Sequence, residues 1–230
     1  MKEEVLKDIL QWQHHLWKTP LLYWEEKVDW KKFDNNSKAL EIGAREGGLS
    51  LWLALKNLDV ICSDIQNPEI KASFLHKKYN LSNKITYTDI DATNIPYENY
   101  FDVIIMKSVL GGIGANNRQD RQIKTIEQVH KALKQGGYFL FAENAKASYL
   151  HQIFRKLKPW SKYWNYPKIE FLEYYLQQRF QIVEIKSFGY ISAFITNTKL
   201  QKLILPIDKM FCKLLPSDSM HIVYGIARKS

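Results

Sequence analysis

The chain has 230 residues, of which 46% are hydrophobic and 25% are charged, and this balance excludes wholesale disorder. No apolar run is long enough for a transmembrane helix, and the amino terminus lacks the apolar core of a secretory signal. Two cysteines, Cys62 and Cys212, exclude a disulfide framework. We therefore expect a cytoplasmic globular protein in which Cys62, inside an apolar run, is a buried thiol.

The formal net charge is +9, from 33 Lys and Arg residues against 24 Asp and Glu residues. Such an excess attracts nucleic acid, anionic lipid or a phosphorylated substrate, or it reflects only a lysine-rich surface. The basic residues are scattered, without a long uninterrupted block and without a recognisable RNA-binding module. We predict on this ground that nucleic acid is not a partner.

Helices come first in the chain, because residues 4–30 contain four tryptophans within one or two helical patterns. From residue 38 to residue 143, short apolar runs alternate with helix-length amphipathic stretches, which is typical of βαβ units and a parallel sheet. The apolar runs of this stretch predict strands at 38–42, 59–63, 85–88, 101–106 and 138–142.

Three helices are predicted between these strands. The first covers residues 49–55 and is largely buried, and the second begins at Pro68, since proline is well tolerated in a first helical turn. The third spans residues 118–135 and is expected to end at Gly136, because glycine readily adopts the left-handed conformation of a helix C-cap. The residues expected on the buried face of the second helix are Ile70, Phe74, Leu75 and Tyr79.

The alternation of short apolar runs with amphipathic stretches ends at residue 143. Two late strands are predicted at 181–186 and 221–227, with a loop and an amphipathic helix between them over 190–215. We predict that the aromatic flanks, residues 10–30 and 150–178, cover the substrate, although packing of added helices over the sheet explains them equally well. The aromatic residues of the second flank include Trp160, Tyr163, Trp164, Tyr166, Tyr174 and Tyr175.

A glycine-rich turn follows the first predicted strand, in the sequence Glu41-Ile42-Gly43-Ala44-Arg45-Glu46-Gly47-Gly48. Glycine allows a tight turn and lets a ligand approach where a Cβ would collide. The helix amino terminus behind the turn offers free N–H groups and a favourable dipole. The pattern predicts a ligand-binding loop, although other nucleotide-binding α/β proteins and plain tight turns share it.

Two acidic residues follow the next predicted strands. Asp64 ends the second strand, where a carboxylate accepts hydrogen bonds from both ribose hydroxyls of a nucleoside-containing cofactor. It could equally cap the helix that begins at Pro68. Asp91 comes just after the third strand, where it could accept a hydrogen bond from an adenine amine or simply cap the turn before Ile95.

With these three elements in this order, residues 38–143 resemble the class I S-adenosylmethionine-dependent methyltransferases, close to the methyltransferase type 11 group. The resemblance implies an α/β fold with a doubly wound, Rossmann-like, seven-stranded sheet. This sheet would be mostly parallel with one antiparallel C-terminal strand, and helices would cover both faces. The implied cofactor is S-adenosylmethionine. The resemblance implies one domain over 1–230, composed of an N-terminal helical cap (1–30), a cofactor-binding core (38–143), strand six with lid or substrate insertions (144–215) and the last strand (216–230).

The same resemblance implies roles for individual residues. Glu41 and Gly43 would line the methionine portion of the cofactor, and Asp64 would hold the ribose. Asp91 with Ala92 would frame the adenine. The residues just after strand four would border both the methionine and the acceptor. The full set of cofactor-binding residues that the resemblance implies is Glu41, Gly43, Ala44, Arg45, Gly47, Asp64, Ile65, Asp91, Ala92, Lys107 and Ser108.

The sequence departs from the family pattern at two places. Arg45 stands where the commoner Gly-x-Gly-x-Gly motif has its central glycine, so the loop gains a cation with no evident partner. The segment 109–114 holds three glycines instead of a His-His or similar pair, which predicts a mobile or close-packed loop without an acid–base residue. A dinucleotide-dependent oxidoreductase is disfavoured, because Glu41 would place a carboxylate near the pyrophosphate but suits cationic amino and sulfonium groups.

Transfer of a methyl group from a sulfonium is an in-line displacement, in which the enzyme mainly aligns the nucleophile with the methyl group. The candidate catalytic residues are Glu143 and His151, which follow strand five at the edge of the sheet where substrates bind, and both could instead be structural. His76 is expected to lie remote from the site, and His130 to be a surface or packing residue. No cluster of His, Cys and acidic residues has the spacing of metal ligands, so no metal is predicted.

The favoured acceptor is a small molecule. A loose resemblance to bacterial methyltransferases of surface-polysaccharide or secondary-metabolite pathways points to O-methylation of a sugar or secondary metabolite. The alternatives are an RNA or other macromolecular methyltransferase, a non-catalytic S-adenosylmethionine-binding protein and a peripheral enzyme on lipid-like substrates. The sequence leaves the oligomeric state open, a homodimer included.

Overall fold

A computed structural model describes residues 2–157, 163–195 and 198–230, and in this part of the chain seven strands form one sheet. The strand order is β3-β2-β1-β4-β5-β7-β6, and β7 runs antiparallel to both of its neighbours while the other pairs are parallel. The predicted fold class is confirmed. The strands are β1 (Lys38–Ile42), β2 (Asp59–Asp64), β3 (Ile85–Asp89), β4 (Phe101–Lys107), β5 (Leu133–Asn144), β6 (Ile182–Phe188) and β7 (Ile222–Arg228).

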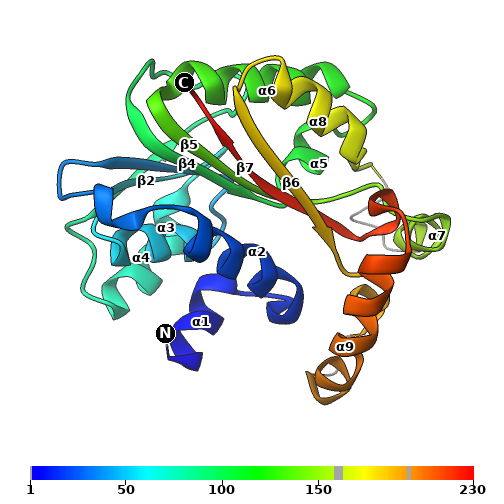
Figure 1. Ribbon diagram of the computed structural model, residues 1–230. Coiled ribbons are helices and arrows are strands. Elements are labelled where there is room, and N and C mark those ends of the chain that lie inside the picture. Colours follow the sequence, from blue (N-terminus) through cyan, green and yellow to red (C-terminus); the bar gives the residue numbers. More distant parts are fainter. Residues whose placement is uncertain (1, 158–162, 196–197) are drawn as a thin grey trace.

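Helices cover both faces of the sheet and bury two apolar clusters (Figure 1). The central strand β4 is buried along almost its whole length, which explains its nearly continuous apolar sequence. The lower face in the figure packs against α1 (Glu3–Leu10), α2 (His14–Lys27), α3 (Gly48–Leu55) and α4 (Pro68–Lys78). The upper face packs against α5 (Leu110–Ile113), α6 (Gln119–Ala132) and α8 (Ile169–Gln177).

Two more helices lie at the end of the sheet where α7 is labelled in Figure 1. These are α7 (Tyr149–Lys156) and α9 (Thr198–Leu214), and α9 extends away from the body of the molecule. Among the described residues, no helix combines the length and apolar character needed to cross a bilayer. Short 3₁₀ helices complete the chain at η1 (Trp30–Lys32), η3 (Ser192–Phe194) and η4 (Ser217–Ser219).

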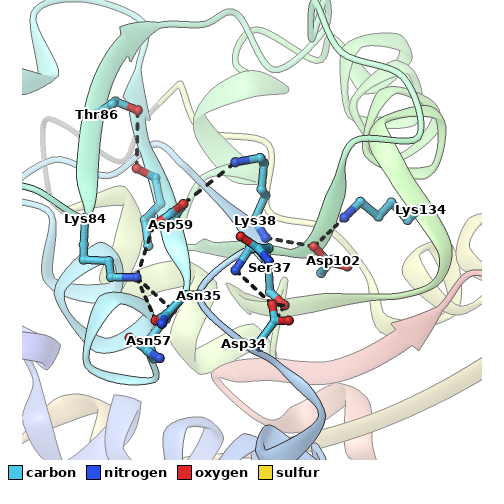
Figure 2. Close-up of polar contacts among 12 residues, drawn as sticks. Asp34, Asn35, Ser37, Lys38, Asn57, Asp59, Lys84, Thr86, Asp102 and Lys134 are labelled. Carbon is cyan, nitrogen blue, oxygen red and sulfur yellow. Dashed lines mark hydrogen bonds and ion pairs between the residues drawn. The ribbon is translucent and has the colours of Figure 1, made fainter.

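Charged residues hold together the amino ends of the parallel strands (Figure 2). The Asp102 carboxylate at the start of β4 accepts hydrogen bonds from the Lys38 backbone N–H and from the Lys134 ammonium, both at 2.8 Å. Asp59 at the start of β2 forms ion pairs with Lys38 at 3.8 Å and with Lys84 at 3.3 Å. This edge is opposite to the edge where the glycine loop lies, so its charges support the fold rather than the site.

The long helix α6 ends earlier than predicted. It stops at Ala132, and the chain continues directly into β5, where Leu133 pairs with Phe101 of β4. Gly136 adopts the left-handed conformation, with φ of +75°, but within the irregular start of the strand and not as a helix cap. The predicted end at Gly136 is wrong because Leu133, which is predicted to lie in the last helical turn, pairs with Phe101 of β4 instead.

The predicted buried face of α4 is wrong for Ile70 and Phe74, whereas Leu75 and Tyr79 are partly buried against the apolar cluster as predicted. Ile70 and Phe74 are each 80% exposed, whereas Ala72 and His76 are buried. The small Ala72 side chain lets the helix lie close to the glycine loop, and hydrogen bonds satisfy both ring nitrogens of His76. Apolar periodicity alone misplaces Ile70 and Phe74, because the buried face of the helix includes a polar residue, His76, whose ring nitrogens have hydrogen-bond partners.

Candidate functional site

The loop after β1 has three residues in the left-handed conformation, Gly43, Arg45 and Gly47, with φ between +53° and +72°. A Cβ on Gly43 would lie 2.7 Å from the Val109 side chain, and one on Gly47 would lie 2.6 Å from the His76 ring. Both glycines are therefore required by close packing as well as by backbone conformation. The loop is held against Val109, just after β4, on one side and against α4 on the other.

His76 supports this loop from below. One ring nitrogen lies 2.8 Å from the Gly47 carbonyl oxygen, and the other lies 2.8 Å from the Tyr87 hydroxyl on β3. Burial lowers the pKa of His76, so the neutral ring is favoured. The expectation that His76 is remote from the site is wrong, since it contacts the glycine loop directly.

Asp64 ties the end of β2 to the glycine loop. One carboxylate oxygen accepts a hydrogen bond from the Arg45 backbone N–H at 3.0 Å, and the other accepts one from the N–H of Ile65 at 2.7 Å. The Ile65 side chain beside it is 60% exposed. An accessible carboxylate next to an exposed apolar side chain fits a ribose together with the face of an adenine ring.

Glu41 and Lys107 are both buried, and each lies near enough to influence the ionisation of the other. The backbone N–H and the hydroxyl of Ser50 both donate to the same Glu41 carboxylate oxygen, each at 2.6 Å. The Lys107 ammonium donates to the Leu10 carbonyl oxygen at 2.8 Å, at the C-terminal end of α1. Burial raises the pKa of Glu41 and lowers that of Lys107, while the opposite charges partly offset both shifts.

Asp91 has local partners at the end of β3. Its carboxylate accepts hydrogen bonds from the N–H and the hydroxyl of Thr93, both at 2.8 Å, and an Arg121 nitrogen lies 3.2 Å away. Partial burial opposes ionisation, but these hydrogen bonds and the Arg121 charge leave the pKa of Asp91 below its ordinary value. Ala92 is buried beside it. Arg121, on α6, has no motif that would have identified it in the sequence.

A short N-terminal segment, residues 8–17, covers the glycine loop; we call it the strap. Its Trp12 ring lies between two cations, with the Arg45 guanidinium 4.7 Å and the Lys107 ammonium 3.9 Å from the ring centroid. This contact supplies the partner that the sequence did not reveal for Arg45. The strap lies against Gly48 so closely that a Cβ there would be 2.2 Å from the Ile9 carbonyl oxygen.

Three buried polar atoms of the strap have no hydrogen-bond partner among the described residues: Gln11 Nε2, His14 Nε2 and Trp17 Nε1. A buried polar atom without a partner is costly, so such atoms normally bind an ordered water, an ion or a ligand. At least two of the three are donors; the Trp17 ring centroid lies 6.0 Å from the Lys107 ammonium, and Gln11 Nε2 would lie 2.9 Å from a Cβ on Gly48. This donor set fits the oxygens of a carboxylate, such as that of the methionine portion of S-adenosylmethionine.

Both carboxylate oxygens of the candidate catalytic residue Glu143 accept hydrogen bonds from the backbone. Its two oxygens accept hydrogen bonds from the Val109 N–H at 3.0 Å, and one also accepts from the Leu110 N–H at 3.1 Å. Burial raises its pKa to about 8, although these donors act in the opposite direction. Close by, Ser108 accepts a hydrogen bond from the Asn144 amide at 2.6 Å. Glu143 thus fixes the start of α5 beneath the site.

The second candidate, His151, is buried between α7 and η3. One ring nitrogen lies 2.8 Å from the Ser148 hydroxyl and the other 2.9 Å from the Tyr190 carbonyl oxygen, and the ring stacks on Phe194. Burial is the main cause that lowers its pKa to about 4. Catalytic roles for Glu143 and His151 stay predictions. Trp160, named with the aromatic flank, lies outside the described residues.

The glycines after β4 are close-packed against an aromatic residue from the second flank. A Cβ on Gly111 would lie 2.7 Å from the Trp164 ring, whereas one on Gly112 would be at an ordinary contact distance of 3.6 Å. The loop is held further by the Gln122 amide, which donates to the Leu110 carbonyl oxygen at 2.8 Å. Gly111, and Gly114 against Gln122, are therefore required by close packing, whereas Gly112 is not.

This neighbouring pair of glycines gives a matched test. We expect Gly111→Ala to destabilise the protein by about 1–3 kcal/mol, because the Trp164 ring must move. We expect Gly112→Ala to be neutral or to stabilise by up to about 1 kcal/mol, because alanine favours the helical conformation. Urea unfolding of both variants checks this, and equal stabilities would show that Trp164 does not pack tightly on α5.

Two cavities are lined by residues outside the glycine loop. One of about 360 Å³ lies between α8 and β6. A second, of about 250 Å³, lies just beyond the carboxyl end of β5 and is lined mainly by polar and charged side chains, including Lys146 and Lys168. The second cavity adjoins the edge of the sheet at which the glycine loop, Asp64 and Ser108 lie.

Comparison with known proteins agrees with this geometry. Residues 40–139 match a protein family described as a methyltransferase domain. Phosphoethanolamine N-methyltransferase 2 of Haemonchus contortus, solved with phosphomonomethylethanolamine and S-adenosylhomocysteine, superposes with a TM-score of 0.64 at 15% identity, over 93% of this chain and 52% of that one. The chain thus spans about half the length of that enzyme.

Two further solved structures have a similar fold. An S-adenosylmethionine-dependent methyltransferase from Archaeoglobus fulgidus superposes with a TM-score of 0.62 at 17% identity, over 92% of this chain and 94% of that one. The cyclase SpnF superposes with a TM-score of 0.60 at 16% identity, over 92% and 80% of the two chains. Identities this low establish the fold and leave the reaction to be argued from the site.

Proposed function

We propose that the chain is a class I S-adenosylmethionine-dependent methyltransferase and that its acceptor is a small polar molecule that is methylated on oxygen. The observation that carries this proposal is the strap, which closes over the glycine loop and places Trp12 between Arg45 and Lys107. A site enclosed in this way admits a small acceptor more readily than a folded macromolecule.

We propose the following roles for the residues around the cofactor. Asp64 accepts hydrogen bonds from the ribose hydroxyls, and Ile65 with Ala92 contacts the adenine, with Asp91 at its edge. The turn from Gly43 through Ala44 to Gly47 presents its backbone to the methionine portion. The carboxylate of that portion would bind the strap atoms that have no partner among the described residues, which are Gln11 Nε2, His14 Nε2 and Trp17 Nε1.

When bound, S-adenosylmethionine supplies an electrophilic methyl group on a sulfonium, and displacement of that methyl leaves S-adenosylhomocysteine. The protein's contribution is to hold the acceptor in line and to exclude water, which the strap and the close-packed α5 favour. We propose that Glu143 acts as a positioning residue, because its carboxylate already holds the backbone of Val109 and Leu110. His151 would likewise position α7, since both of its ring nitrogens have partners.

The cavity after β5 supports a polar acceptor. Its lining combines the basic residues Lys146 and Lys168 with the acidic residues Glu170 and Asp218, and Gln152 adds an amide. Such a lining suits hydroxyl groups, which both donate and accept hydrogen bonds. A sugar or a hydroxylated secondary metabolite has this character.

The proposal is tested by release of S-adenosylhomocysteine from the purified protein with S-adenosylmethionine and a panel of sugars, hydroxylated aromatic compounds, amines and RNA. We expect turnover with a hydroxylated small molecule and none with RNA. Turnover with RNA alone would assign a macromolecular acceptor, and turnover with amines alone would overturn O-methylation. Cofactor binding without turnover on any acceptor would favour the non-catalytic alternative.

A further inference from the structure

Helices α7 and α9 lie at one end of the molecule (Figure 1), and they carry many exposed apolar side chains. We propose that this surface binds the anionic face of a lipid membrane. The inference is independent of methyl transfer, since it concerns residues outside the glycine loop and the strap. We call it the α7–α9 surface, and its exposed residues used here are Tyr149, Leu150, Ile153, Phe154 and Leu157 with Leu203, Ile207, Met210 and Leu214.

The exposed residues of α9 form one stripe. Leu203, Ile207, Met210 and Leu214 recur at intervals of four, three and four residues, which places them on one side of an α-helix. Their exposed fractions are 71%, 45%, 51% and 71%, in that order. A soluble protein normally buries such a stripe, so a contiguous exposed one indicates an interaction surface.

The opposite side of α9 is anchored to the body of the protein. The buried Asp208 carboxylate accepts hydrogen bonds from the backbone N–H groups of Tyr190 at 2.8 Å and Ile191 at 2.7 Å, and from the Ser192 hydroxyl. Phe211 stacks on the Tyr190 ring, with 5.5 Å between the ring centroids. These contacts fix the rotation of α9 about its axis, so the apolar stripe stays turned outward.

The apolar surface continues from α9 to α7 through η3. Phe194 of η3 lies 4.9 Å from Phe154 of α7, measured between ring centroids, and η3 packs against α9. Along α7, exposed apolar residues occur at 149, 150, 153, 154 and 157. The helix lies shortly after the carboxyl end of β5, so the surface adjoins the edge of the sheet that carries the candidate site.

The positive charge of the two helices favours an anionic partner. The described side chains of α9 include the exposed Lys209 and Lys213, and the one acid in its sequence, Asp208, is buried. The α7 sequence contains no acid and adds the exposed Lys156. Apolar side chains flanked by lysines, on a chain of net charge +9, match the interfacial binding of amphipathic helices to anionic lipid.

A second copy of the chain fits this surface less well. Pairing of two α9 stripes about a twofold axis would bring the lysines of both helices close together. Interhelical pairing of this type is normally supported by opposite charges beside the apolar seam, and α9 offers no exposed acid for that purpose. An anionic bilayer satisfies both the apolar stripe and the lysines.

Flotation of the full chain with lipid vesicles tests the proposal. We expect binding to vesicles of phosphatidylcholine with phosphatidylserine, weaker binding at high salt, and at least tenfold weaker binding to phosphatidylcholine alone. The double variants Leu203→Gln with Leu214→Gln, and Lys209→Gln with Lys213→Gln, should each weaken binding at least tenfold. Circular dichroism of each variant verifies that it is folded.

The matched control is Ile70→Gln with Phe74→Gln, which removes two equally exposed apolar residues from α4. This variant should bind the mixed vesicles like the original chain. The proposal is overturned if the original chain does not bind them, or if only the α4 variant loses binding. It is also overturned if light scattering finds a dimer that the Leu203 and Leu214 changes dissociate, since the surface would then bind a second copy.

Discussion

Lowering the pH from about 6.5 to about 4 is expected to reduce the free energy of unfolding by roughly 3 kcal/mol through His151 alone. Burial lowers the pKa of this residue from 6.5 to about 4 in the folded protein, and the Arg155 charge adds to the shift. Between these two values the unfolded chain binds a proton that the folded chain does not. The stabilisation is therefore complete above pH 6.5 and is lost as the pH falls to 4.

Urea unfolding across this pH range, compared between the original chain and His151→Gln, isolates the contribution. Burial also lowers the pKa values of His15, His76 and His130, so part of the acid sensitivity should remain in the variant. His130→Gln is the matched control, because His130 is only half-buried and should change the pH dependence less. If His151→Gln keeps the full pH dependence, His151 is not protonated on unfolding as this structure requires.

Replacing Gly48 by alanine is expected to displace the strap from the glycine loop. The added Cβ would lie 2.2 Å from the Ile9 carbonyl oxygen and 2.9 Å from the Asp8 carbonyl oxygen. Both are backbone atoms, so no side-chain rotation relieves the contact, and α1 must move relative to α3. We expect a loss of stability of about 3 kcal/mol, at the upper end of the usual cost of overpacking.

Hydrogen exchange of residues 3–27, measured together with urea unfolding, follows this displacement. Gly48→Ala should increase exchange in α1 and α2 more than in the sheet. Gly112→Ala is the control, since its added Cβ meets only an ordinary contact. Unchanged exchange in α1 and α2 would show that the strap does not depend on the close approach at Gly48.

Much of the fold could be predicted because its signals are local. The apolar runs at 38–42 and 101–106 coincide with buried central strands, and the loop from Gly43 to Gly47 has the left-handed residues that its glycines suggested. The buried Cys62 thiol is confirmed as well. Each of these features depends on a few neighbouring residues, so a sequence pattern suffices.

The contacts around the site could not be predicted, because they join residues that are far apart in the chain. Lys107 binds the carbonyl oxygen of Leu10, and Trp12 meets Arg45, although nothing in either local sequence indicates the other. The same holds for Glu143, whose carboxylate binds the backbone at 109 and 110. A buried polar group needs a hydrogen-bond partner, but that partner can be identified only once the fold shows which residues lie beside it.

Calorimetric titration of S-adenosylmethionine and S-adenosylhomocysteine into the original chain, Asp64→Ala and Asp59→Ala tests whether Asp64 and the glycine loop bind this cofactor. Asp59 lies at the other end of the same strand and is the control. We predict saturable binding that Asp64→Ala weakens at least tenfold, about 1.4 kcal/mol, and that Asp59→Ala leaves unchanged. No binding of either ligand to the folded original chain, or equal binding by Asp64→Ala, would contradict the account.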